Sequence, residues 1–288
     1  MKIFLNHCHV APEGTYSRND PALGSLRGLE EILRALSATR AVALAPFMHC
    51  MPNDGWYRNP LPQENACNEW LYNEIRNYPE ITAFITVSPK NPEAGKILET
   101  YARKGFKGVK LHPPVFQVGL DEPAVDDFCR RVEEIGLPLL IHTSSHGWHP
   151  EKYRPRLIGL LAAKYPRLKI IVEHMGGRDY FEEALAMLEK YKNCYAGLTS
   201  TLQPRTGDNR PDAPAGLENS SYLAPEKTME IVRRIGCRRI IYGMDYPFNN
   251  AALTASDLEH IRDWPVSAEE KEYILWKTLE ELLDAKQS

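Results

Sequence analysis

One stretch of the sequence, at residues 137–177, predicts a strand, a helix and a second strand: LPLLIHTSSHGWHPEKYRPRLIGLLAAKYPRLKIIVEHMGG. Short runs rich in branched apolar side chains lie near its two ends. The segment Pro155–Lys164 between them carries apolar residues at helical spacing. A strand followed by a helix and another strand is the repeating unit of a parallel sheet. Each apolar run is followed by a histidine, so the unit also predicts polar side chains at the ends of strands.

The same alternation continues along the rest of the chain. We expect eight strands, at Lys2–Asn6, Ala41–Pro46, Thr82–Val87, Gly108–Leu111, Leu137–His142, Lys169–Glu173, Cys194–Thr199 and Arg239–Met244. Helices are expected at Leu23–Ser37, Gln63–Tyr78, Pro92–Lys104, Glu122–Ile135, Pro155–Lys164, Tyr180–Tyr191, Pro225–Ile235 and Ser267–Lys286. This pattern predicts an α/β fold, a single (β/α)8 TIM barrel that takes up residues 1–288 as one domain.

Three long connections are rich in Pro, Gly and Asn, and each follows a predicted strand. They are Phe47–Pro62, Thr143–Tyr153 and Ser200–Leu223. In such barrels the loops that leave the carboxyl ends of the strands build the active site, whereas the opposite end keeps short turns. We therefore expect the active site at the carboxyl ends of the strands.

Composition and charge exclude several classes of protein. The 38 acidic and 35 basic side chains give a net charge of −3, without the dense basic cluster that binds nucleic acid. The longest apolar stretch, Ala41–Met48, is far shorter than the roughly 20 residues that cross a bilayer. The start of the chain lacks the pattern of an export signal, and the six cysteines form no Cys-x-x-Cys pair. We expect a soluble cytoplasmic protein with a small-molecule substrate.

Side chains that bind metals follow four of the predicted strands. His7 and His9 are two residues apart, so we expect both to point into the barrel mouth. His142, His174 and Asp245 follow the fifth, sixth and eighth apolar runs. Taken singly, each histidine would more often be a buried, hydrogen-bonded residue. Together, these nitrogen and oxygen donors suit Zn²⁺ or a neighbouring divalent ion.

The segments around these residues resemble the metal-dependent amidohydrolase superfamily. The similarity is to the branch shared with aminocarboxymuconate semialdehyde decarboxylase and related aromatic-acid decarboxylases. The matching segments are His7-Cys8-His9, GFKGVKLHP at 105–113, LLIH at 139–142, HMGG at 174–177 and GMDYP at 243–247. The resemblance implies a (β/α)8 barrel in which His7, His9, His142 and Asp245 are metal ligands and His174 is a catalytic or supporting residue. Homo-oligomers are common among such enzymes, and the subunit number stays open.

Two positions depart from the family pattern. Leu5 stands where the family usually has Asp, two residues before the first histidine, and Met244 stands where it usually has Ser. Neither change removes a ligand. Hydrogen bonds from neighbouring residues orient metal ligands and tune their basicity. We therefore expect Leu5 to leave the ligands of the first strand with less support.

Lys110 and His112 lie on and just after the fourth predicted strand. Binuclear members of the superfamily carry a carboxylated lysine there that bridges two metals, and Lys110 holds the corresponding place. An internal ion pair is the alternative interpretation, and we expect one metal ion. His112 faces the same way, as a substrate contact or as a structural histidine.

Three further residues are candidate substrate contacts. Arg178 could bind a substrate carboxylate with both ends of its guanidinium group, or could pair with Asp179 or Glu182 at the start of the next helix. Trp148 and Arg58 lie in the long loops after the fifth and second strands, where we expect pocket walls or lids. Aromatic loop residues could equally pack on the barrel rim or form a subunit interface.

Three functions fit this set of residues. We expect Zn²⁺, with Mn²⁺ or Fe²⁺ as alternatives, and Zn²⁺ would lower the pKa of a bound water from about 15.7 to about 7. Asp245 would accept the proton of that water, and His174 would donate to the developing oxyanion or act as the acid/base. The first hypothesis is a hydrolase of a small carboxylate-bearing amide, lactone or ester. The second is a non-oxidative decarboxylase of an aromatic or unsaturated acid, for which Arg178 or Arg58 would clamp the carboxylate. The third is a barrel that binds a metal or metabolite without turning it over.

Overall fold

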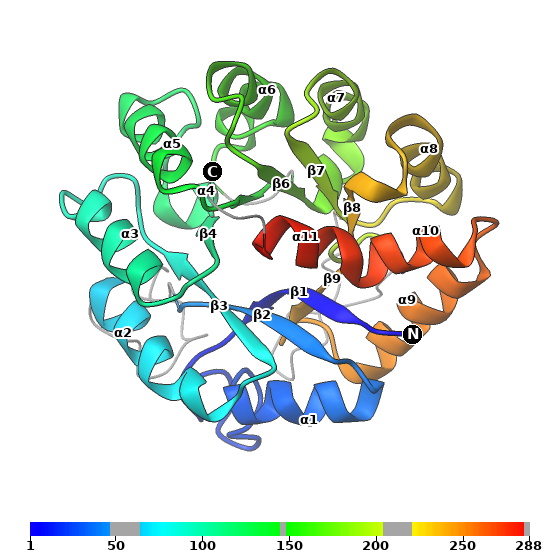
Figure 1. Cartoon of the computed structure of the whole chain (residues 1–288), viewed down its shortest axis with the longest axis horizontal. Coiled ribbons are helices and arrows are strands. Elements are labelled where there is room, and N and C mark those ends of the chain that lie inside the picture. The colour runs from blue at the N-terminus through cyan, green and yellow to red at the C-terminus, as the bar shows by residue number, and fades with distance from the viewer. Residues whose placement is uncertain (47–63, 145–147, 204–220, 285–288) are drawn as a thin grey trace.

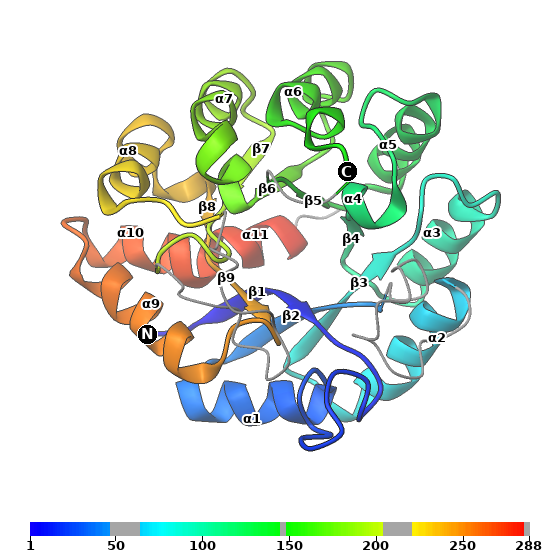
Figure 2. The ribbon, with the colours of Figure 1, turned by 180° about the vertical axis from the view of Figure 1, so that it is seen from behind.

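The computed structural model describes residues 1–46, 64–144, 148–203 and 221–284. Parallel strands form a nearly closed barrel surrounded by helices, which confirms the predicted α/β barrel (Figures 1 and 2). Neighbours in the sheet follow the order β8-β7-β6-β5-β4-β3-β2-β1-β9. The strands are β1 (Phe4–His9), β2 (Arg40–Leu44), β3 (Ile81–Thr86), β4 (Gly108–Leu111), β5 (Leu139–His142), β6 (Ile170–Glu173), β7 (Cys194–Gly197), β8 (Ile240–Ile241) and β9 (Gly243–Tyr246).

The expected eighth strand is divided into β8 and β9 at Tyr242. β8 pairs with β7, whereas β9 pairs with β1, so this one stretch of chain joins the two edges of the sheet. The Tyr242 amide donates instead to the carbonyl of Ile274, 3.0 Å away in the C-terminal region. Its hydroxyl lies 3.1 Å from Asp257. The break therefore ties the barrel wall to the last helices of the chain.

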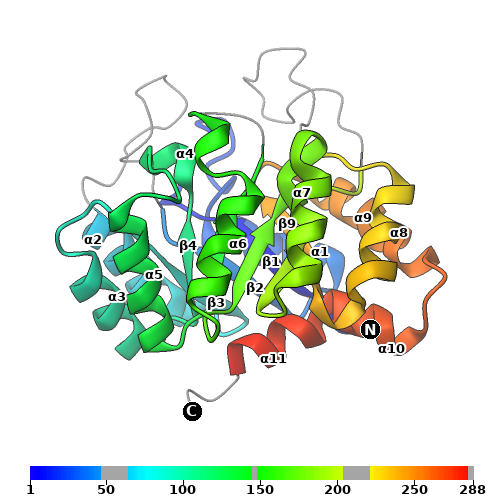
Figure 3. The ribbon, with the colours of Figure 1, turned by 90° about the horizontal axis from the view of Figure 1, so that it is seen from above.

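The helices lie outside the barrel, except at one end (Figures 1 and 3). They are α1 (Leu26–Leu36), α2 (Glu64–Glu74), α3 (Ala94–Arg103), α4 (Pro113–Phe116), α5 (Pro123–Ile135), α6 (Pro155–Lys164), α7 (Gly177–Lys190), α8 (Pro225–Ile235), α9 (Ala251–Asp263), α10 (Ala268–Glu272) and α11 (Thr278–Asp284). Short turns are η2 (Ile75–Asn77), η3 (Pro150–Lys152), η4 (His174–Gly176) and η5 (Cys237–Arg239), and a π-helical turn, η6 (Tyr273–Lys277), joins α10 to α11.

Helix α9 is an element that the sequence pattern does not predict. Its buried residues are Thr254, Asp257, Leu258 and Ile261. Because two of these four are polar, the apolar spacing that indicates a helix is weak. The expected helix at Ser267–Lys286 is likewise divided, into α10, η6 and α11.

The core has two layers. Between sheet and helices lies a large apolar cluster that includes Leu5, Cys8 and Leu29. Inside the barrel lies a smaller one that includes Phe4, Phe84 and Ile171 and continues into Leu279, Leu282 and Leu283 of α11. Helix α11 lies across the end at which the strands begin, as Figure 3 shows. Because apolar side chains fill that end of the barrel, we expect the active site at the opposite end.

Truncation of Leu279 is expected to show how much this closure contributes to stability. Leu279 is 1% exposed, and a Leu→Ala change at such a site costs about 2–5 kcal/mol in free energy of unfolding. Leu160, which is 62% exposed on α6, provides the control. Urea unfolding of Leu279→Ala and Leu160→Ala should show a large loss for the first and about 0.5 kcal/mol or less for the second. Equal losses would mean that α11 does not close the barrel.

Two further features of the fold bear on the sequence analysis. Among the helices that the structure describes, none has the length and apolar character of a membrane-spanning segment. Of the cysteines, Cys8, Cys67, Cys129, Cys194 and Cys237 are buried and free.

Candidate metal centre

Three metal-binding side chains meet at the carboxyl ends of the strands. His7 and His9 of β1 bring their Nε2 atoms to 3.0 Å from each other. Asp245 Oδ1, from β9, lies 3.5 Å from Nε2 of His9 and 3.9 Å from Nε2 of His7. Two ligands about 2.1 Å from one ion are at most about 4.2 Å apart. The spacing of the three donors therefore fits a single divalent ion.

The protonation states of these groups also suit the binding of a cation. Burial lowers the pKa of His7 well below its ordinary value, and the nearby Lys110 lowers it further. Burial lowers the pKa of His9 as well. Burial raises the pKa of Asp245, but the hydrogen bond to His9 and the nearby His7 and His174 outweigh it and hold that pKa well below its usual range. Neutral imidazoles and an ionised carboxylate are the forms that bind a metal.

A β-bulge in β1 sets the direction of these side chains. Between Leu5 and Cys8, β1 advances three residues while β2 advances two, and His7 has a φ of 62°. Leu5 therefore packs outward, in the layer between sheet and helices, and the Asn6 side chain turns inward. Regular alternation would have placed Leu5 on the same side as His7. Leu5 corresponds in sequence to the family's aspartate. In this chain, however, the side chain that points inward here is that of Asn6.

Backbone strain is concentrated at this site. Eight non-glycine residues in the described chain have positive φ, and four of them are His7, His174, Ser200 and Asp245. Such conformations cost about 1–3 kcal/mol each and persist where surrounding contacts hold them. The Ser200 hydroxyl donates to Asp245 Oδ2 at 2.7 Å, and His174 Nδ1 lies 2.8 Å from the carbonyl oxygen of Thr199.

His174 connects this group to the other two predicted histidines. Its ring centroid lies 5.2 Å from that of His7 and 4.7 Å from that of His142. The His142 ring stacks on His112 at 4.1 Å, and His142 Nε2 lies 3.0 Å from Ser144 Oγ. The structure therefore places His142 on the wall beside the three-donor group, with His174 between them.

Lys110 extends from β4 into the same place. The side chain is fully buried, and its Nζ lies 3.0 Å from His7 Nε2. Burial lowers the pKa of Lys110 to about 7, against the opposing charges of Glu173 and Asp245. The lysine thus faces the atom that His7 would present to an ion.

The other predicted contacts lie farther out. Arg178 is exposed on the first turn of α7. Trp148 is half-buried, and its ring meets that of His149 edge-on at 5.0 Å. Arg58 lies outside the described residues.

The sequence analysis missed Asn6, Glu173 and Ser200. Glu173 is fully buried and accepts a 2.6 Å hydrogen bond from the Asn6 side-chain amide. A signal was available, because Glu173 is a charged residue directly after the apolar run Ile170–Val172, and charged residues are seldom fully buried unless they are paired.

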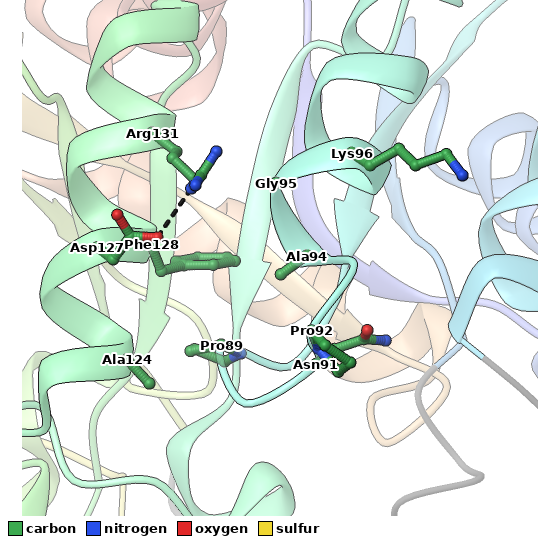
Figure 4. A pocket seen from close by; sticks show the side chains of 10 residues that line it. All are labelled: Pro89, Asn91, Pro92, Ala94, Gly95, Lys96, Ala124, Asp127, Phe128 and Arg131. Atoms are coloured by element: carbon green, nitrogen blue, oxygen red, sulfur yellow. Dashed lines mark hydrogen bonds and ion pairs between the residues drawn. The ribbon is translucent and has the colours of Figure 1, made fainter.

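A small groove on the outside of the barrel is separate from this centre. It has a volume of about 150 Å³ and lies between α3 and α5, as Figure 4 shows. Pro89, Phe128 and Arg131 are among its lining residues, and Arg131 pairs with Asp127 at 2.8 Å. Its lining includes none of the candidate ligands, so the metal chemistry belongs to the barrel mouth.

A parallel barrel with a histidine and carboxylate centre at its carboxyl end defines a class of metal-dependent enzymes. Residues 7–284 match the family model described as Amidohydrolase, and the chain therefore belongs to the amidohydrolase family. The superfamily is metal-dependent. A match to the dihydroorotase of Helicobacter hepaticus has 31% identity over 105 residues, which are 33% of this chain and 29% of that protein's length.

Solved structures confirm the fold. An uncharacterised TIM-barrel protein from Bordetella bronchiseptica has a TM-score of 0.71 at 17% identity and covers 98% of both chains. A putative 2-pyrone-4,6-dicarboxylic acid hydrolase from Pseudomonas putida has a TM-score of 0.64 at 17% identity, with 99% of this chain and 98% of that chain covered. A dihydroxybenzoic acid decarboxylase from Polaromonas, with bound manganese and the inhibitor 2-nitroresorcinol, has a TM-score of 0.67 at 15% identity, with 100% and 98% covered. At these identities the likeness establishes the fold alone.

Proposed function

We propose that the protein is a metal-dependent hydrolase that acts on a small carboxylate-bearing amide, lactone or ester. One observation carries this proposal: the partly buried, ionised carboxylate of Asp245 lies beside two neutral imidazoles. Its Oδ1 faces His7 and His9, and its Oδ2 is held by Ser200. Such a carboxylate is placed to take a proton from water at the point where an ion would be held.

One divalent ion is the cofactor that these residues fit. His7, His9 and Asp245 would hold it, and we propose His142 as a further ligand on the adjacent wall. When bound, the ion would lower the pKa of water and polarise a substrate carbonyl. Zn²⁺ suits the donor set, and Mn²⁺, the ion named for the Polaromonas structure, suits the carboxylate ligand.

The two proton-handling residues have different roles in this proposal. Because a carbonyl oxygen only accepts hydrogen bonds, His174 Nδ1 carries the proton that faces Thr199. Burial lowers the pKa of His174, so the ring is neutral and Nε2 offers a lone pair. In place of the expected donation to the developing oxyanion, we therefore assign His174 Nε2 to accept a hydrogen bond from the attacking water and orient it. Asp245 takes the water's proton and returns it to the leaving group.

A decarboxylase is the second candidate, favoured by flat rings near the centre. The Phe248 ring lies 5.6 Å from that of His9, and Tyr16 meets Phe248 edge-on at 6.2 Å. The stacked rings of His112 and His142 form another flat surface. These surfaces suit an aromatic acid, the substrate class named for the Polaromonas structure. Asp245 would then take a proton from water and deliver it to the carbon that loses CO₂, while His174 Nε2 would orient that water. Arg178 or Arg58 would hold the carboxylate.

A substrate panel distinguishes the candidates. The protein is loaded with Zn²⁺ or Mn²⁺ and incubated with carboxylate-bearing lactones, amides and esters and with hydroxybenzoates. Products are separated by chromatography, and CO₂ is measured. We expect ring opening or bond cleavage by water without CO₂. Release of CO₂ without hydrolysis would select the decarboxylase, and tight binding without turnover would select the non-catalytic barrel.

We predict about one metal ion per chain. A second ion needs an anionic bridge, which Lys110 would provide only after carboxylation, and its unmodified Nζ already faces His7 at 3.0 Å. Elemental analysis after purification in excess metal should therefore give a ratio near one, and Lys110→Met should leave that ratio unchanged. Two ions per chain, reduced by Lys110→Met, together with a ¹³C NMR carbamate signal after growth on labelled bicarbonate, would contradict this prediction.

A further inference from the structure

We propose that Glu173 is the positioning residue that fixes the tautomer and orientation of His7 for metal binding. This inference rests on the proposed metal centre and identifies which residue supports its first ligand. Leu5 cannot supply that support, because the bulge in β1 turns it outward into the apolar layer. The inward-facing carboxylate comes instead from β6.

The His7 ring lies between two sets of partners. Its Nε2 faces His9 and Asp245, where an ion would be held. Its Nδ1 lies 3.2 Å from Glu173 Oε2, and the two side chains are 1% and 0% exposed. Both atoms are buried and have no partner that meets the distance and angle of a hydrogen bond in the part of the chain that the structure describes, and the 3.2 Å approach brings them together. A carboxylate behind a ligating histidine is an arrangement that orients the ring and raises its basicity.

The carboxylate is itself held by neighbouring strands. Asn6, which the bulge turns inward, donates its side-chain amide to Glu173 Oε1 at 2.6 Å. Gly197 pairs with Glu173 across β6 and β7. A Cβ at position 197 would lie 2.6 Å from the carboxyl carbon of Glu173, closer than real Cβ contacts allow. Glycine at this position therefore leaves the space that Glu173 occupies.

The hydrogen-bond directions predict what Glu173→Gln would do. Because Asn6 donates to Oε1, the glutamine oxygen is expected to remain there, which turns its NH₂ group toward His7 Nδ1. That NH₂ group donates, so His7 would have to carry its proton on Nε2, the atom that faces the metal position. We expect metal affinity to fall by about 10–100-fold.

The test measures metal binding and the tautomer directly. Zn²⁺ affinity is determined by chelator competition, and the His7 tautomer is determined by ¹⁵N NMR in metal-free protein. Glu173→Gln should weaken affinity and move the proton to Nε2. The double variant Asn6→Asp with Glu173→Gln should recover affinity, because the carboxylate introduced at position 6 would accept from the glutamine NH₂ and leave the glutamine oxygen for His7.

Asp257→Asn is the matched control. Asp257 is another buried carboxylate, 3% exposed, and its Oδ2 accepts from Tyr242. The change from carboxylate to amide there should leave Zn²⁺ affinity within about twofold of the parent, since Asp257 lies on α9 and its partner Tyr242 is not a candidate ligand.

The outcomes separate this inference from the proposed function. If the parent protein binds Zn²⁺ and folded Glu173→Gln binds it within twofold with the same tautomer, the role of Glu173 is refuted and the metal centre stands. If the parent protein binds no divalent ion, the metal centre itself fails, and this inference fails with it. If Glu173→Gln does not fold, Gly197→Ala provides the test, because its Cβ should displace the Glu173 side chain. We expect this variant to bind Zn²⁺ more weakly, and an unchanged affinity would overturn the inference.

Discussion

Asp245→Asn is expected to lower kcat by about 10³-fold or more in the metal-loaded protein. The substitution removes the ionised oxygen beside His7 and His9, and with it the acceptor of the water's proton. General acid–base groups contribute about 10²–10⁴-fold. The amide oxygen can still accept from Ser200, so the barrel should stay folded. Steady-state kinetics on the substrate identified by the panel would measure the loss.

Two measurements show which property of Asp245 matters. Asp257→Asn makes the same chemical change at a buried position and should keep nearly full activity. The absorption spectrum of Co²⁺-loaded Asp245→Asn shows whether the ion is retained. A large loss of kcat with the ion in place would assign proton transfer to Asp245, and a lost ion would assign mainly a ligand role. Turnover close to that of the parent would contradict both roles.

The barrel could be predicted from local patterns because its strands are buried on both faces. Continuous apolar runs such as Leu139–Ile141 and Ile170–Val172 mark these strands directly. Where the local pattern is weaker, the prediction fails. Helix α9 buries Thr254 and Asp257, and the eighth strand breaks at Tyr242 because a distant carbonyl, that of Ile274, takes its amide proton.

From the sequence, the site could be predicted only to lie at the ends of particular strands. His7 and His9 do converge, as predicted from their spacing. Regular alternation of side chains along β1 does not explain their orientation, because the strand contains a bulge. The bulge depends on how β1 pairs with β2 and β9, and pairing register is not visible within a single segment. The role proposed for Glu173 was hidden for the same reason, since its partners Asn6 and His7 are far away in sequence and meet it only across the barrel.

The four positive-φ residues of the centre join these observations into one physical picture. His7 and Asp245 lie within β1 and β9, and His174 and Ser200 follow β6 and β7. Each is held by a contact from another strand end or loop. The conformational cost, about 1–3 kcal/mol for each, is offset by these contacts. A bound ion would add a further restraint that links β1 and β9. The centre should therefore be coupled to the stability of the whole barrel.

Metal removal is accordingly expected to abolish activity and to lower the melting temperature by about 10 °C. An ion present at about 1,000 times its Kd adds about 4 kcal/mol to the stability of the folded state. For a chain of this size, each kcal/mol shifts the melting temperature by about 2–4 °C. Calorimetry before and after dialysis against a chelator measures the shift, and activity should return with Zn²⁺ or Mn²⁺.

A ligand variant makes this result specific to the proposed centre. His9→Ala removes one of the three donors, so its melting temperature should rise little when Zn²⁺ is added to the metal-free protein. Leu160→Ala, on the exposed face of α6, should show the same rise as the parent. If His9→Ala gained as much thermal stability from Zn²⁺ as the parent protein, the ion would be bound elsewhere, and the three converging side chains would have to be explained without a metal.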